Sequence, residues 1–405
     1  MLIVQKYGGS SVANTERIKI VAQRIVDTYN LNNSLVVILS AQGDTTNELL
    51  AKIAEITSTP SKRETDMLLA TGEQQSVALM SMAIQSLGYP AVSLNAQQVG
   101  ISSSVTYSNA RIEKIENARI LKELAAKNIV IIAGFQGINS HGDITTLGRG
   151  GSDTSAVALA ASLNANLCEI YTDVDGIYTA DPRIVADAQK LTEISYDEML
   201  EMASLGANVL HNRSVELAKK NNIKLVVRSS FVLDKGTVVK EKRKMESVYV
   251  SGVVSDSNVA TISIIGIKDT PGMAYNIFSA LALKKISIDI ILQSVGRAGT
   301  KDIVFTLAES DLADALEVLG TQDDIITCEE ITVNKDVAKL SVIGAGIEAN
   351  PEVAPIMFGA LFHANINISM IATSEIKLSV IIDQKDAKHG VQVVHDALIG
   401  ENNQL

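Results

Sequence analysis

The sequence contains only two cysteines in 405 residues, Cys168 and Cys328, and neither stands in a CxxC or CxxH spacing. This pattern indicates neither a disulfide framework nor a zinc site, so we expect two buried thiols. The start, "MLIVQKYGGSS", passes from a short apolar run directly into glycines, which is too brief for a signal-peptide core or a membrane span. These absences predict a cytoplasmic protein with no membrane association.

Positive charge is also in short supply, because 35 Lys and Arg face 46 Asp and Glu, for a net charge of −11. Nucleic acids and anionic membranes attract a positive field, so neither is expected as a partner. The one basic run, "KEKRK" at 240–244, is better explained as a solvated connector than as a nucleic-acid patch. A hydrophobic content of 46% predicts a folded globular chain, and its length predicts two or three domains.

Several common catalytic motifs are missing. The sequence has no GxxxxGK[ST] loop, no protein-kinase catalytic loop and no dinucleotide-binding GxGxxG followed by its acidic residue. His141 and His211 stand apart from any HExxH or nucleophile elbow, so we expect structural histidines. The stretch "YTDVDGIYTADPR" lacks the later glutamate of an EF-hand, and no protein metal site is predicted.

Short β-branched runs alternate with helical segments from residue 1 to about residue 230. The runs are "LIVQK", "SLVVILS", "NIVIIAGF", "NLCEIYTD" and "IKLVVRSS". This alternation predicts an α/β fold with a mostly parallel central sheet and helices on both faces. Ligands of such sheets bind at the carboxyl ends of the strands.

Four polar turns fall where these strands end: "KYGGSS", "SAQGDTTNELL", "TTLGRGGSDTSAVALAASLNA" and "YTDVDGIYTADPR". Lys6 is either a point charge for transferring phosphates or a surface lysine beside a tight turn. Arg149 offers a planar fork to a carboxylate or a phosphate, and Ser152 and Asp153 are natural helix caps. The residues alone therefore indicate an enzyme with several anion-binding turns and leave open which anion each turn holds.

The C-terminal part repeats itself. "VATISIIGIKDTPGMAYNIFSALALKKISIDII", from residue 259, aligns with "VAKLSVIGAGIEANPEVAPIMFGALFHANINISMI", from residue 337. Each copy predicts a βαββ unit, and two tandem copies indicate a paired ligand-binding or dimerisation module. The expected domains are residues 1–235, a linker at 236–255, and two repeats at 256–330 and 331–405.

Together, these blocks resemble the aspartate kinases, which have the amino acid kinase fold, over essentially the whole chain. The resemblance rests on "KYGGSS", "SAQGDTTNEL", "DMLLATGEQ", "IAGFQG", "TTLGRGGSDTSAVALAASL" and "CEIYTDVDGIYTADPR", in family order and spacing. The repeats resemble the ferredoxin-like ACT domains of that family. The resemblance implies phosphorylation of the β-carboxylate of L-aspartate by ATP and Mg²⁺, the entry step toward lysine, threonine and methionine.

The resemblance also implies roles for individual residues. Lys6 would stabilise the transferred phosphoryl group, and Asp153 would orient Lys6. The ATP-binding residues would be Lys6, Tyr7, Gly8, Gly9, Thr172, Asp173, Tyr178, Asp181, Pro182, Arg183, Asn208 and Val209. The aspartate site would comprise Ser40, Thr46, Glu73, Arg149, Gly150, Gly151 and Ser152, with Arg149 on the α-carboxylate and Glu73 on the α-ammonium. Contacts to an effector, lysine or threonine or both, would be Asp269, Gln293, Asn367, Ile368 and Glu375.

One departure from the family pattern has a measurable consequence. Asn208 stands where the family commonly has a lysine in "GAKVL", which removes a positive charge near ATP. We therefore expect a raised KM for ATP with a modest loss of kcat. Asn208→Lys should lower that KM in steady-state titrations, and an unchanged value would contradict the idea.

Two other functions stay open at this stage. The chain could be another amino acid kinase, of the acetylglutamate or glutamate kinase type, or a catalytically silent amino acid sensor. Glu73 and Arg149 favour a free amino acid as substrate, and the presence of Lys6, Asp153 and Arg149 argues against a silent protein. We expect a homodimer or higher oligomer through the repeats, and leave open whether Met245 begins a separate shorter subunit.

Overall fold

The structure is a computed structural model that describes residues 1–205, 209–241, 250–294, 299–320, 328–347 and 350–400. The chain divides into two compact units. The first unit comprises Met1–Tyr178 and Lys190–Ser247, and the second comprises Thr179–Gln189 and Val248–Leu405. No helix within the described residues is long and apolar enough to cross a membrane.

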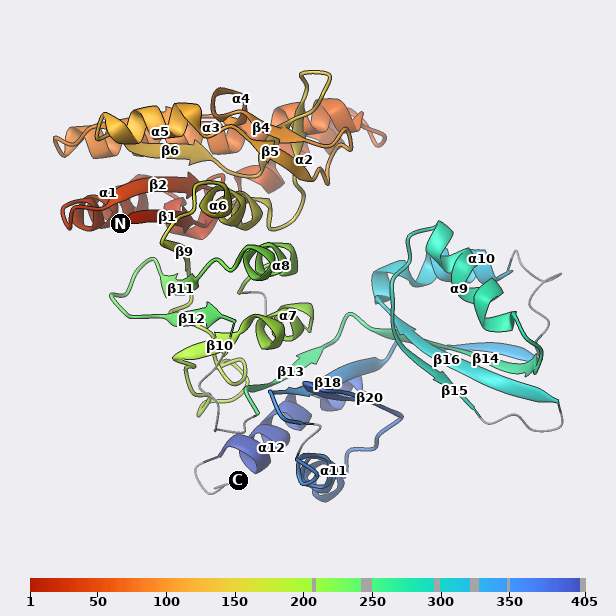
Figure 1. Ribbon diagram of the computed structural model, residues 1–405. Coiled ribbons are helices and arrows are strands. Elements are labelled where there is room, and N and C mark those ends of the chain that lie inside the picture. The colour runs from red at the N-terminus through yellow and green to blue at the C-terminus, as the bar shows by residue number, and fades with distance from the viewer. Residues whose placement is uncertain (206–208, 242–249, 295–298, 321–327, 348–349, 401–405) are drawn as a thin grey trace. The chain divides into compact units, whose positions relative to one another are not determined.

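An eight-stranded sheet runs through the first unit, in the order β10-β12-β11-β9-β1-β2-β6-β3 (Figure 1). Every neighbouring pair is parallel except β11 and β12, which confirms the mostly parallel sheet. Its strands are β1 (Leu2–Tyr7), β2 (Ser34–Leu39), β3 (Ala91–Leu94), β6 (Ile129–Ala133), β9 (Leu167–Thr172), β10 (Glu193–Ser195), β11 (Leu225–Ser229) and β12 (Thr237–Lys240).

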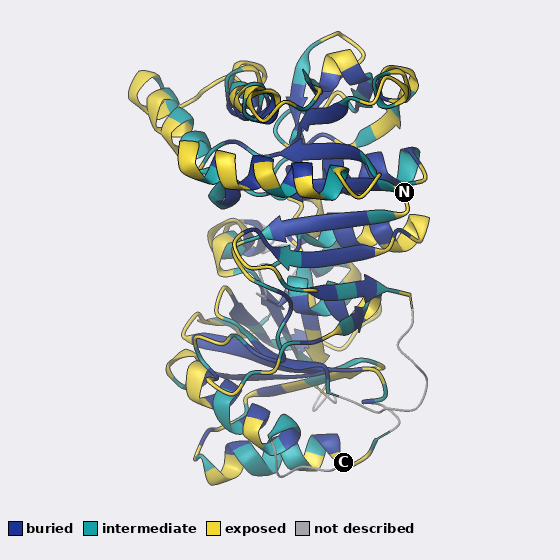
Figure 2. Ribbon diagram, turned by 90° about the vertical axis from the view of Figure 1, so that its left-hand side faces the viewer, coloured by how far each residue is buried: buried dark blue, intermediate teal, exposed yellow. Residues whose placement is uncertain are grey.

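Helices cover the sheet because its central strands are apolar on both faces. On one face Ile3, Leu35 and Val37 pack with apolar residues of α1 and α3, and the other face contacts α6. Figure 2 shows the strands buried beneath helices that expose only their outer side. The helices of this unit are α1 (Thr15–Tyr29), α2 (Thr45–Ile56), α3 (Lys62–Ser86), α4 (Ala96–Val99), α5 (Ala118–Ala125), α6 (Gly151–Ser162), α7 (Tyr196–Ser204) and α8 (Asn212–Asn221), with a 3₁₀ turn, η1 (Gly9–Val12).

A second, smaller sheet in this unit was not anticipated from the sequence. Its order is β5-β4-β7-β8, with β4 (Ile101–Ser103), β5 (Ile112–Ile115), β7 (Gln136–Ile138) and β8 (Ile144–Thr146). Strands of three or four residues are too short to show a clear alternation of polar and apolar side chains. This sheet leads directly into the glycine-rich turn, because β8 ends at Thr146.

The second unit contains the sequence repeat as two four-stranded antiparallel sheets. One has the order β15-β16-β14-β17 and the other the order β13-β18-β20-β19. Residues that align between the two sequence repeats have similar surroundings in the structure. For example, Leu281 in the first repeat and Leu361 in the second are both fully buried. The elements are β13 (Gly252–Asp256), β14 (Ala260–Lys268), α9 (Met273–Leu283), β15 (Ile288–Gln293), β16 (Thr300–Leu307), η2 (Glu309–Asp311), α10 (Leu312–Gly320), β17 (Glu330–Asn334), β18 (Val337–Ile343), α11 (Val353–His363), β19 (Met370–Ser374), β20 (Lys377–Asp383), η3 (Gln384–Asp386) and α12 (Ala387–Ile399).

Each repeat is longer than the expected βαββ unit, because a further helix and strand complete a ferredoxin-like fold. In the first repeat, α10 and β17 follow the hairpin. In the second, α12 follows the hairpin, but the fourth strand is β13, which precedes the first repeat and pairs antiparallel with β18. The first repeat is therefore inserted into the second. Both ends of the expected linker, 236–255, hold strands, β12 and β13, while residues 242–249 lie outside the described part.

A loop between β9 and β10 belongs to the second unit. Residues 179–189 place Ala180 and Val185 in the apolar core formed by β13, β18, β20, α11 and α12. Hydrogen bonds fix the loop there, since Val253 N–H donates to Thr179 O at 2.7 Å and His395 Nε2 lies 2.8 Å from Thr179 Oγ1. The expected range 1–235 includes this loop, whereas the loop belongs to the second compact unit. The domain boundaries expected from the sequence stay a proposal.

The two cysteines differ in environment. Cys168 is buried in β9, and burial raises the pKa of its thiol far above the ordinary value. Cys328 is partly exposed. The expectation of a buried thiol is confirmed for Cys168 and is wrong for Cys328.

Candidate active site

The polar turns that follow the strands meet at one edge of the large sheet. The strands β9, β1, β2 and β6 are parallel neighbours, so their carboxyl ends lie side by side. Backbone hydrogen bonds continue past the strand ends: Ser40 N–H donates to Tyr7 O at 3.2 Å, and Gly134 N–H donates to Leu39 O at 3.0 Å. Lys6, Ser40 and Thr172 are thereby brought to the same edge.

A buried ion pair lies at this edge. Lys6 Nζ is 2.5 Å from Asp153 Oδ1, and both residues are buried. Lys6 comes from β1 and Asp153 from the first turn of α6, where the helix dipole favours an anion. Asp153 thus holds the Lys6 ammonium at the end of β1.

The glycines after Lys6 allow the chain to pass close to its neighbours. A Cβ atom on Gly9 would lie 2.7 Å from the carbonyl oxygen of Ala41, and one on Gly8 would lie 3.5 Å from Lys6 Nζ. Tyr7 is fully buried and its ring stacks on Tyr171 at 4.5 Å. Any contact of Tyr7 with a ligand is therefore through its backbone.

Glu73, in the middle of α3, is a buried carboxylate with one unused oxygen. Its Oε1 accepts a hydrogen bond from Ala41 N–H at 3.0 Å, while Oε2 has no hydrogen-bond partner among the described residues. Burial raises the pKa of Glu73 to about 7, and the hydrogen bond from Ala41 opposes that rise. A buried carboxylate of this kind is suited to a cationic ligand group.

The glycine-rich turn between β8 and α6 has a backbone that only glycine adopts readily. Gly148 and Gly150 have φ angles of 77° and 68°, and a Cβ atom on Gly150 would lie 2.3 Å from His211. Between them, Arg149 is exposed, whereas Ser152 is buried at the start of α6. The turn thus presents an exposed guanidinium next to buried hydroxyl and carboxylate groups.

Two residues that the sequence reasoning missed hold this turn. Asp66 is fully buried and accepts hydrogen bonds from the N–H groups of Thr146 and Ser108, both at 2.8 Å. Arg213 donates to Leu147 O at 2.7 Å. Asp66 lies seven residues before Glu73 on the same face of α3, but its burial is visible only in the structure, so no pattern in the sequence singles it out.

His211 also proves to be close to the turn. It precedes α8 and packs against Gly150, and its burial lowers its pKa, an effect that the nearby Asp153 opposes. We therefore expect a neutral imidazole near pH 7. His141, by contrast, is exposed in the turn after β7.

The residues expected around the nucleoside are only partly brought together. Thr172 Oγ1 donates to Asp173 at 2.9 Å, and Tyr178 donates to Asp175 at 2.8 Å. Asp181 pairs with Arg183, and both lie with Pro182 in the loop assigned to the second unit. Val209 is partly exposed before α8, and Asn208 lies outside the described residues. For these positions nucleotide binding stays a prediction.

The remaining aspartate-site residues lie where their motifs end. Ser40 follows β2 and Thr46 is in the first turn of α2, both partly exposed, and Gly151 opens α6. Gly134 makes room for Ser152, because a Cβ atom there would lie 2.8 Å from Ser152 Oγ.

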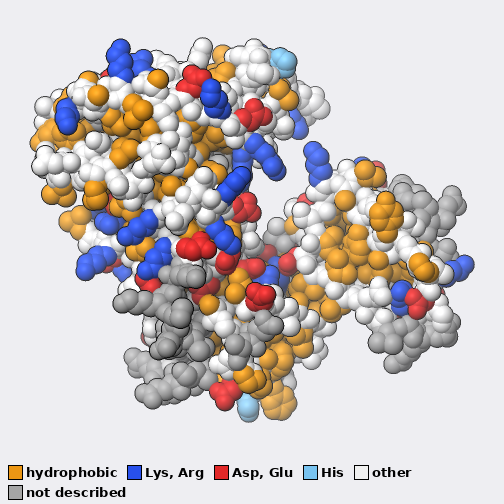
Figure 3. All heavy atoms as spheres, in the orientation of Figure 1, with side chains coloured by type: hydrophobic (Ala, Val, Ile, Leu, Met, Phe, Trp, Pro, Cys, Tyr) orange, Lys and Arg blue, Asp and Glu red, His pale blue; other side chains and the backbone are white. Residues whose placement is uncertain are grey.

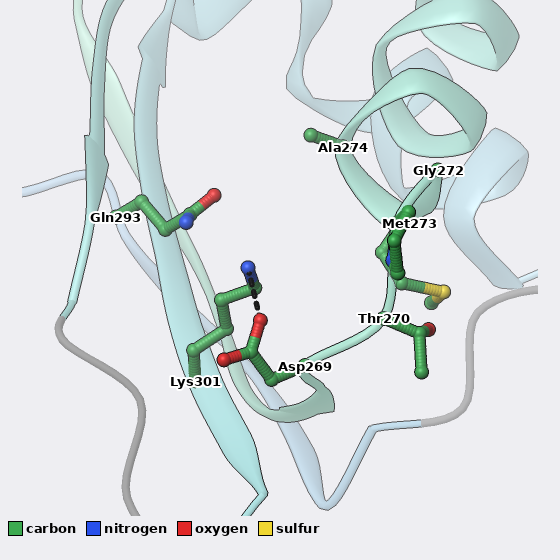
Figure 4. Close-up of a pocket in the computed structure, with 8 residues that line it drawn as sticks. Asp269, Thr270, Gly272, Met273, Ala274, Gln293 and Lys301 are labelled. Atoms are coloured by element: carbon green, nitrogen blue, oxygen red, sulfur yellow. Dashed lines mark ion pairs between the residues drawn. The ribbon is translucent and has the colours of Figure 1, made fainter.

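Two of the five expected effector residues line a pocket in the first repeat. Asp269 follows β14 and Gln293 ends β15, and both face the start of α9 across the pocket (Figure 4). Asn367, Ile368 and Glu375 lie instead in the second repeat, around β19. Asn367 and Glu375 are exposed, and Ile368 packs on the core of that repeat.

Comparison with known proteins adds to this geometry. A model of the amino acid kinase family matches residues 1–229, and a model of the ACT domain matches residues 262–322 and 340–398. The aspartokinase of Helicobacter pylori strain 26695 is 48% identical over 400 residues, which is 98% of each chain.

Solved structures are similar over the same length. Escherichia coli aspartokinase III in complex with aspartate and ADP is 26% identical, with a TM-score of 0.84, over 98% of this chain and all of that one. The same enzyme in complex with lysine and aspartate is 27% identical, with a TM-score of 0.73, over 98% and 99% of the two chains.

Proposed function

The chain belongs to the amino acid kinase family and within it to the aspartokinases, and from this premise we propose how its residues phosphorylate L-aspartate. The reaction transfers the γ-phosphoryl group of ATP to the β-carboxylate, giving ADP and 4-phospho-L-aspartate. The buried Lys6–Asp153 pair, together with the buried, unpartnered oxygen of Glu73, is the observation that carries the proposal.

We infer that aspartate binds between α3 and α6. The unused Oε2 of Glu73 accepts the α-ammonium, which gives that buried oxygen the partner it lacks. Arg149 and Ser152 hold the α-carboxylate, with the backbone of Gly150 and Gly151 beside them. Ser40 and Thr46 are proposed to offer hydroxyls from the end of β2 and the start of α2.

ATP is proposed to bind along the ends of β1 and β9. The chain at Gly8 and Gly9 passes beside the phosphates with the N–H of Gly9 facing them, since the N–H of Gly8 donates to Tyr171 O at 3.2 Å, and Lys6 reaches the γ-phosphoryl group. Thr172, Asp173, Tyr178 and Val209 are proposed nucleoside contacts. Asp181, Pro182, Arg183 and Asn208 are proposed contacts on the family resemblance alone.

The chemistry requires no general base. A β-carboxylate titrates near pH ~4, so it is already an anion at neutral pH and attacks phosphorus as its own nucleophile. One bond forms between the carboxylate oxygen and phosphorus while the bond from phosphorus to the ADP oxygen breaks. Catalysis then consists of holding two anions in line, which is the work of Lys6, the backbone N–H groups and the clamps on aspartate.

Mg²⁺ is proposed to enter on the ATP phosphates. The site fits an ion held mainly by phosphate oxygens and water, because Asp153, the buried carboxylate beside Lys6, is already paired with that lysine. When bound, the ion neutralises charge on the phosphates. The protein itself then needs to contribute only the Lys6 ammonium and backbone N–H donors to the transferred phosphoryl group.

Substrate choice tests the proposal. ADP release by the purified protein is measured with L-aspartate, L-glutamate and N-acetyl-L-glutamate under the same conditions. We expect turnover with L-aspartate at least 100-fold above the other two acceptors. Turnover with glutamate or N-acetylglutamate alone would identify another amino acid kinase, and no turnover with any acceptor would identify a silent sensor.

The pH dependence of aspartate binding tests Glu73. Its pKa of about 7 means that the carboxylate is mostly ionised at pH 8 and mostly protonated at pH 6. Because only the ionised form attracts an ammonium group, the KM for aspartate should rise about fivefold to tenfold from pH 8 to pH 6. The KM for ATP and the kcat at saturating aspartate should change much less. Glu73→Gln should have a high KM at both pH values, and a wild-type KM that does not vary would contradict the role.

The ACT repeats are proposed to regulate the enzyme by binding an amino acid, lysine or threonine or both. The supporting observations are the ACT match and the pocket that contains Asp269 and Gln293. Asn367, Ile368 and Glu375 are proposed contacts in the second repeat. The enzyme is proposed to act in the cytoplasm, at the entry to lysine, threonine and methionine synthesis.

We also propose a homodimer, or a higher oligomer, through the repeats. Strands β15 and β19 are the edges of their sheets and expose Ile291 and Ile371. Figure 3 shows hydrophobic side chains gathered on the face of the first repeat, over the region of α9 and β14–β16.

The oligomer is tested by introducing charged residues at the exposed edge strands β15 and β19. Ile291→Glu with Ile371→Glu should at least halve the molar mass measured by light scattering, because a buried glutamate at an apolar contact is costly. Ile20→Glu, on an exposed site of α1, is the matched control and should leave the mass unchanged. A wild-type protein that runs as a monomer at all concentrations would refute the proposal.

A further inference from the structure

Asp66 of α3 is a buried carboxylate that the proposed reaction does not use. It is fully buried, and it accepts four hydrogen bonds from two residues. Its Oδ2 accepts from the N–H groups of Ser108 and Thr146, both at 2.8 Å. Its Oδ1 accepts from the Ser108 hydroxyl at 3.3 Å and from the Thr146 hydroxyl at 2.9 Å. Burying a carboxylate is costly unless hydrogen bonds satisfy it, so these four bonds are what allows Asp66 at this position.

These hydrogen bonds hold the chain where it enters the glycine-rich turn. Thr146 is the last residue of β8, and the exposed Arg149 follows three residues later. The residue between Thr146 and the glycines is held as well, because Leu147 N–H donates to Phe135 O at 2.8 Å and Leu147 O accepts from Arg213 at 2.7 Å. Arg149 therefore projects from a base that is fixed up to residue 147.

The same face of α3 carries the residue proposed to bind the α-ammonium. Asp66, Ala70 and Glu73 are all buried, and steps of four and three residues place them on one side of the helix. Ala70 O accepts a hydrogen bond from Gln136 Nε2 at 3.2 Å, and the N–H of the residue before Gln136 donates to Ser155 Oγ of α6 at 3.1 Å. Helix α3 is thus tied to the chain before the turn through Asp66 and to α6 after the turn through β7.

The two α-groups of an amino acid are attached to one carbon atom, so the residues that bind them must be kept at one separation. A small displacement of either residue is expected to weaken binding strongly. We propose that Asp66 is a positioning residue, which fixes the turn of Arg149 relative to Glu73 and thereby sets the affinity for aspartate. The inference rests on the proposed function, because it takes Arg149 as the partner of the α-carboxylate and Glu73 as the partner of the α-ammonium. Asp66 is fully buried, so it acts on aspartate only through the turn.

The first measurement separates positioning from stability. Asp66→Ala removes all four hydrogen bonds and should raise the KM for aspartate about tenfold, while kcat and the KM for ATP change less than about threefold. Met80→Ala, in the apolar core that α3 shares with the large sheet, is the matched control. It should lower the unfolding temperature and leave the KM for aspartate unchanged, because a smaller folded fraction reduces the apparent kcat and not the KM. An unchanged KM for aspartate in a folded Asp66→Ala enzyme would overturn the proposal.

A double variant shows whether Asp66 acts through Arg149. If it does, Asp66→Ala combined with Arg149→Ala should have the KM for aspartate of Arg149→Ala alone, within about twofold, because the position of the turn no longer matters once the guanidinium is gone. If the two effects multiplied instead, Asp66 would act independently of Arg149, and the proposal would be wrong.

A milder variant gives a result even if Asp66→Ala does not fold. Thr146→Val keeps the shape of the side chain and removes one hydroxyl donor to Asp66, so it should raise the KM for aspartate about threefold. If Asp66→Ala does not fold, an unchanged KM for aspartate in Thr146→Val refutes the role of Asp66.

Hydrogen exchange measured by mass spectrometry follows the turn without any substrate. Exchange of residues 147–153, relative to that of β2, should become about tenfold faster in Asp66→Ala and stay unchanged in Met80→Ala. Equal exchange in wild type and Asp66→Ala would overturn the inference while leaving aspartate-dependent ADP release intact. Absence of that release in the wild type would refute the proposed function instead, and the exchange measurement would still report whether Asp66 holds the turn.

Discussion

Replacing Lys6 by methionine is expected to lower kcat about 100-fold to 1000-fold, with much smaller changes in the KM of either substrate. Lys6 pairs with Asp153, so its ammonium is already oriented before substrates bind. Removing a single preorganised donor from the site of charge development costs about 10²–10³ in kcat. The change is measured by steady-state ADP release over a full titration of ATP and aspartate.

This variant also leaves Asp153 as a buried, unpaired carboxylate, which costs about 3 kcal/mol of stability. The double variant Lys6→Met with Asp153→Asn removes that charge and should recover part of the lost stability in thermal unfolding while staying inactive. Lys19→Met, on the exposed side of α1, is the matched control and should keep full activity. A Lys6→Met enzyme that is stable and retains more than a tenth of the wild-type kcat would contradict the proposed role.

Replacing Arg149 by alanine is expected to raise the KM for aspartate about 10-fold to 100-fold and the KM for ATP less than about threefold. A hydrogen bond between charged groups contributes about 1.5–3 kcal/mol, which corresponds to this range. The assignment depends on position, since Arg149 follows β8 beside Ser152, whereas the glycine turn proposed to face the phosphates follows β1.

The matched variants for Arg149 test charge against geometry. Arg149→Lys keeps the positive charge but loses the planar fork, so its KM for aspartate should fall between those of wild type and alanine. Arg119→Ala removes an exposed arginine that pairs with Glu123 on α5, and its kinetics should be those of the wild type. If Arg149→Ala raised the KM for ATP more than the KM for aspartate, the glycine-rich turn would have to be assigned to nucleotide binding instead.

The large sheet and the repeat could be predicted because each rests on a strong local pattern. Strands such as β2 are buried on both faces and appear as unbroken apolar runs. The two regulatory helices could be aligned because buried residues such as Leu281 and Leu361 recur at the same positions.

Features that depend on distant pairing could not be predicted in the same way. Nothing local in "GVVSD" indicates that β13 passes over the first repeat to pair with β18. The loop at 179–189 packs on its core through Ala180, Ile184, Val185 and Ala188, but these residues follow no helical or strand period that would reveal the core that receives them.

In the site, the glycine turns and Lys6 stood out because their residue types are unusual for strand ends. The residues that support those turns could not be predicted, because the sequence alone does not distinguish a buried aspartate such as Asp66 from an exposed one. Asp66 acts through hydrogen bonds that it accepts from the backbone N–H groups and the side-chain hydroxyls of Thr146 and Ser108, which lie far from it in the sequence. Its partners become visible only when α3 and β8 are placed together.

The loop at 179–189 limits how this protein can be divided into separate polypeptides. A fragment that ends before β13 keeps the loop but loses the core around Ala180 and Val185, and would present apolar residues to water. A regulatory polypeptide that starts at Met245 contains β13 and every later strand, but lacks the loop that fills this core. Such a polypeptide would leave the part of the core occupied by Ala180 and Val185 unfilled, so truncation at this point removes apolar contacts from the very repeat that it is meant to preserve.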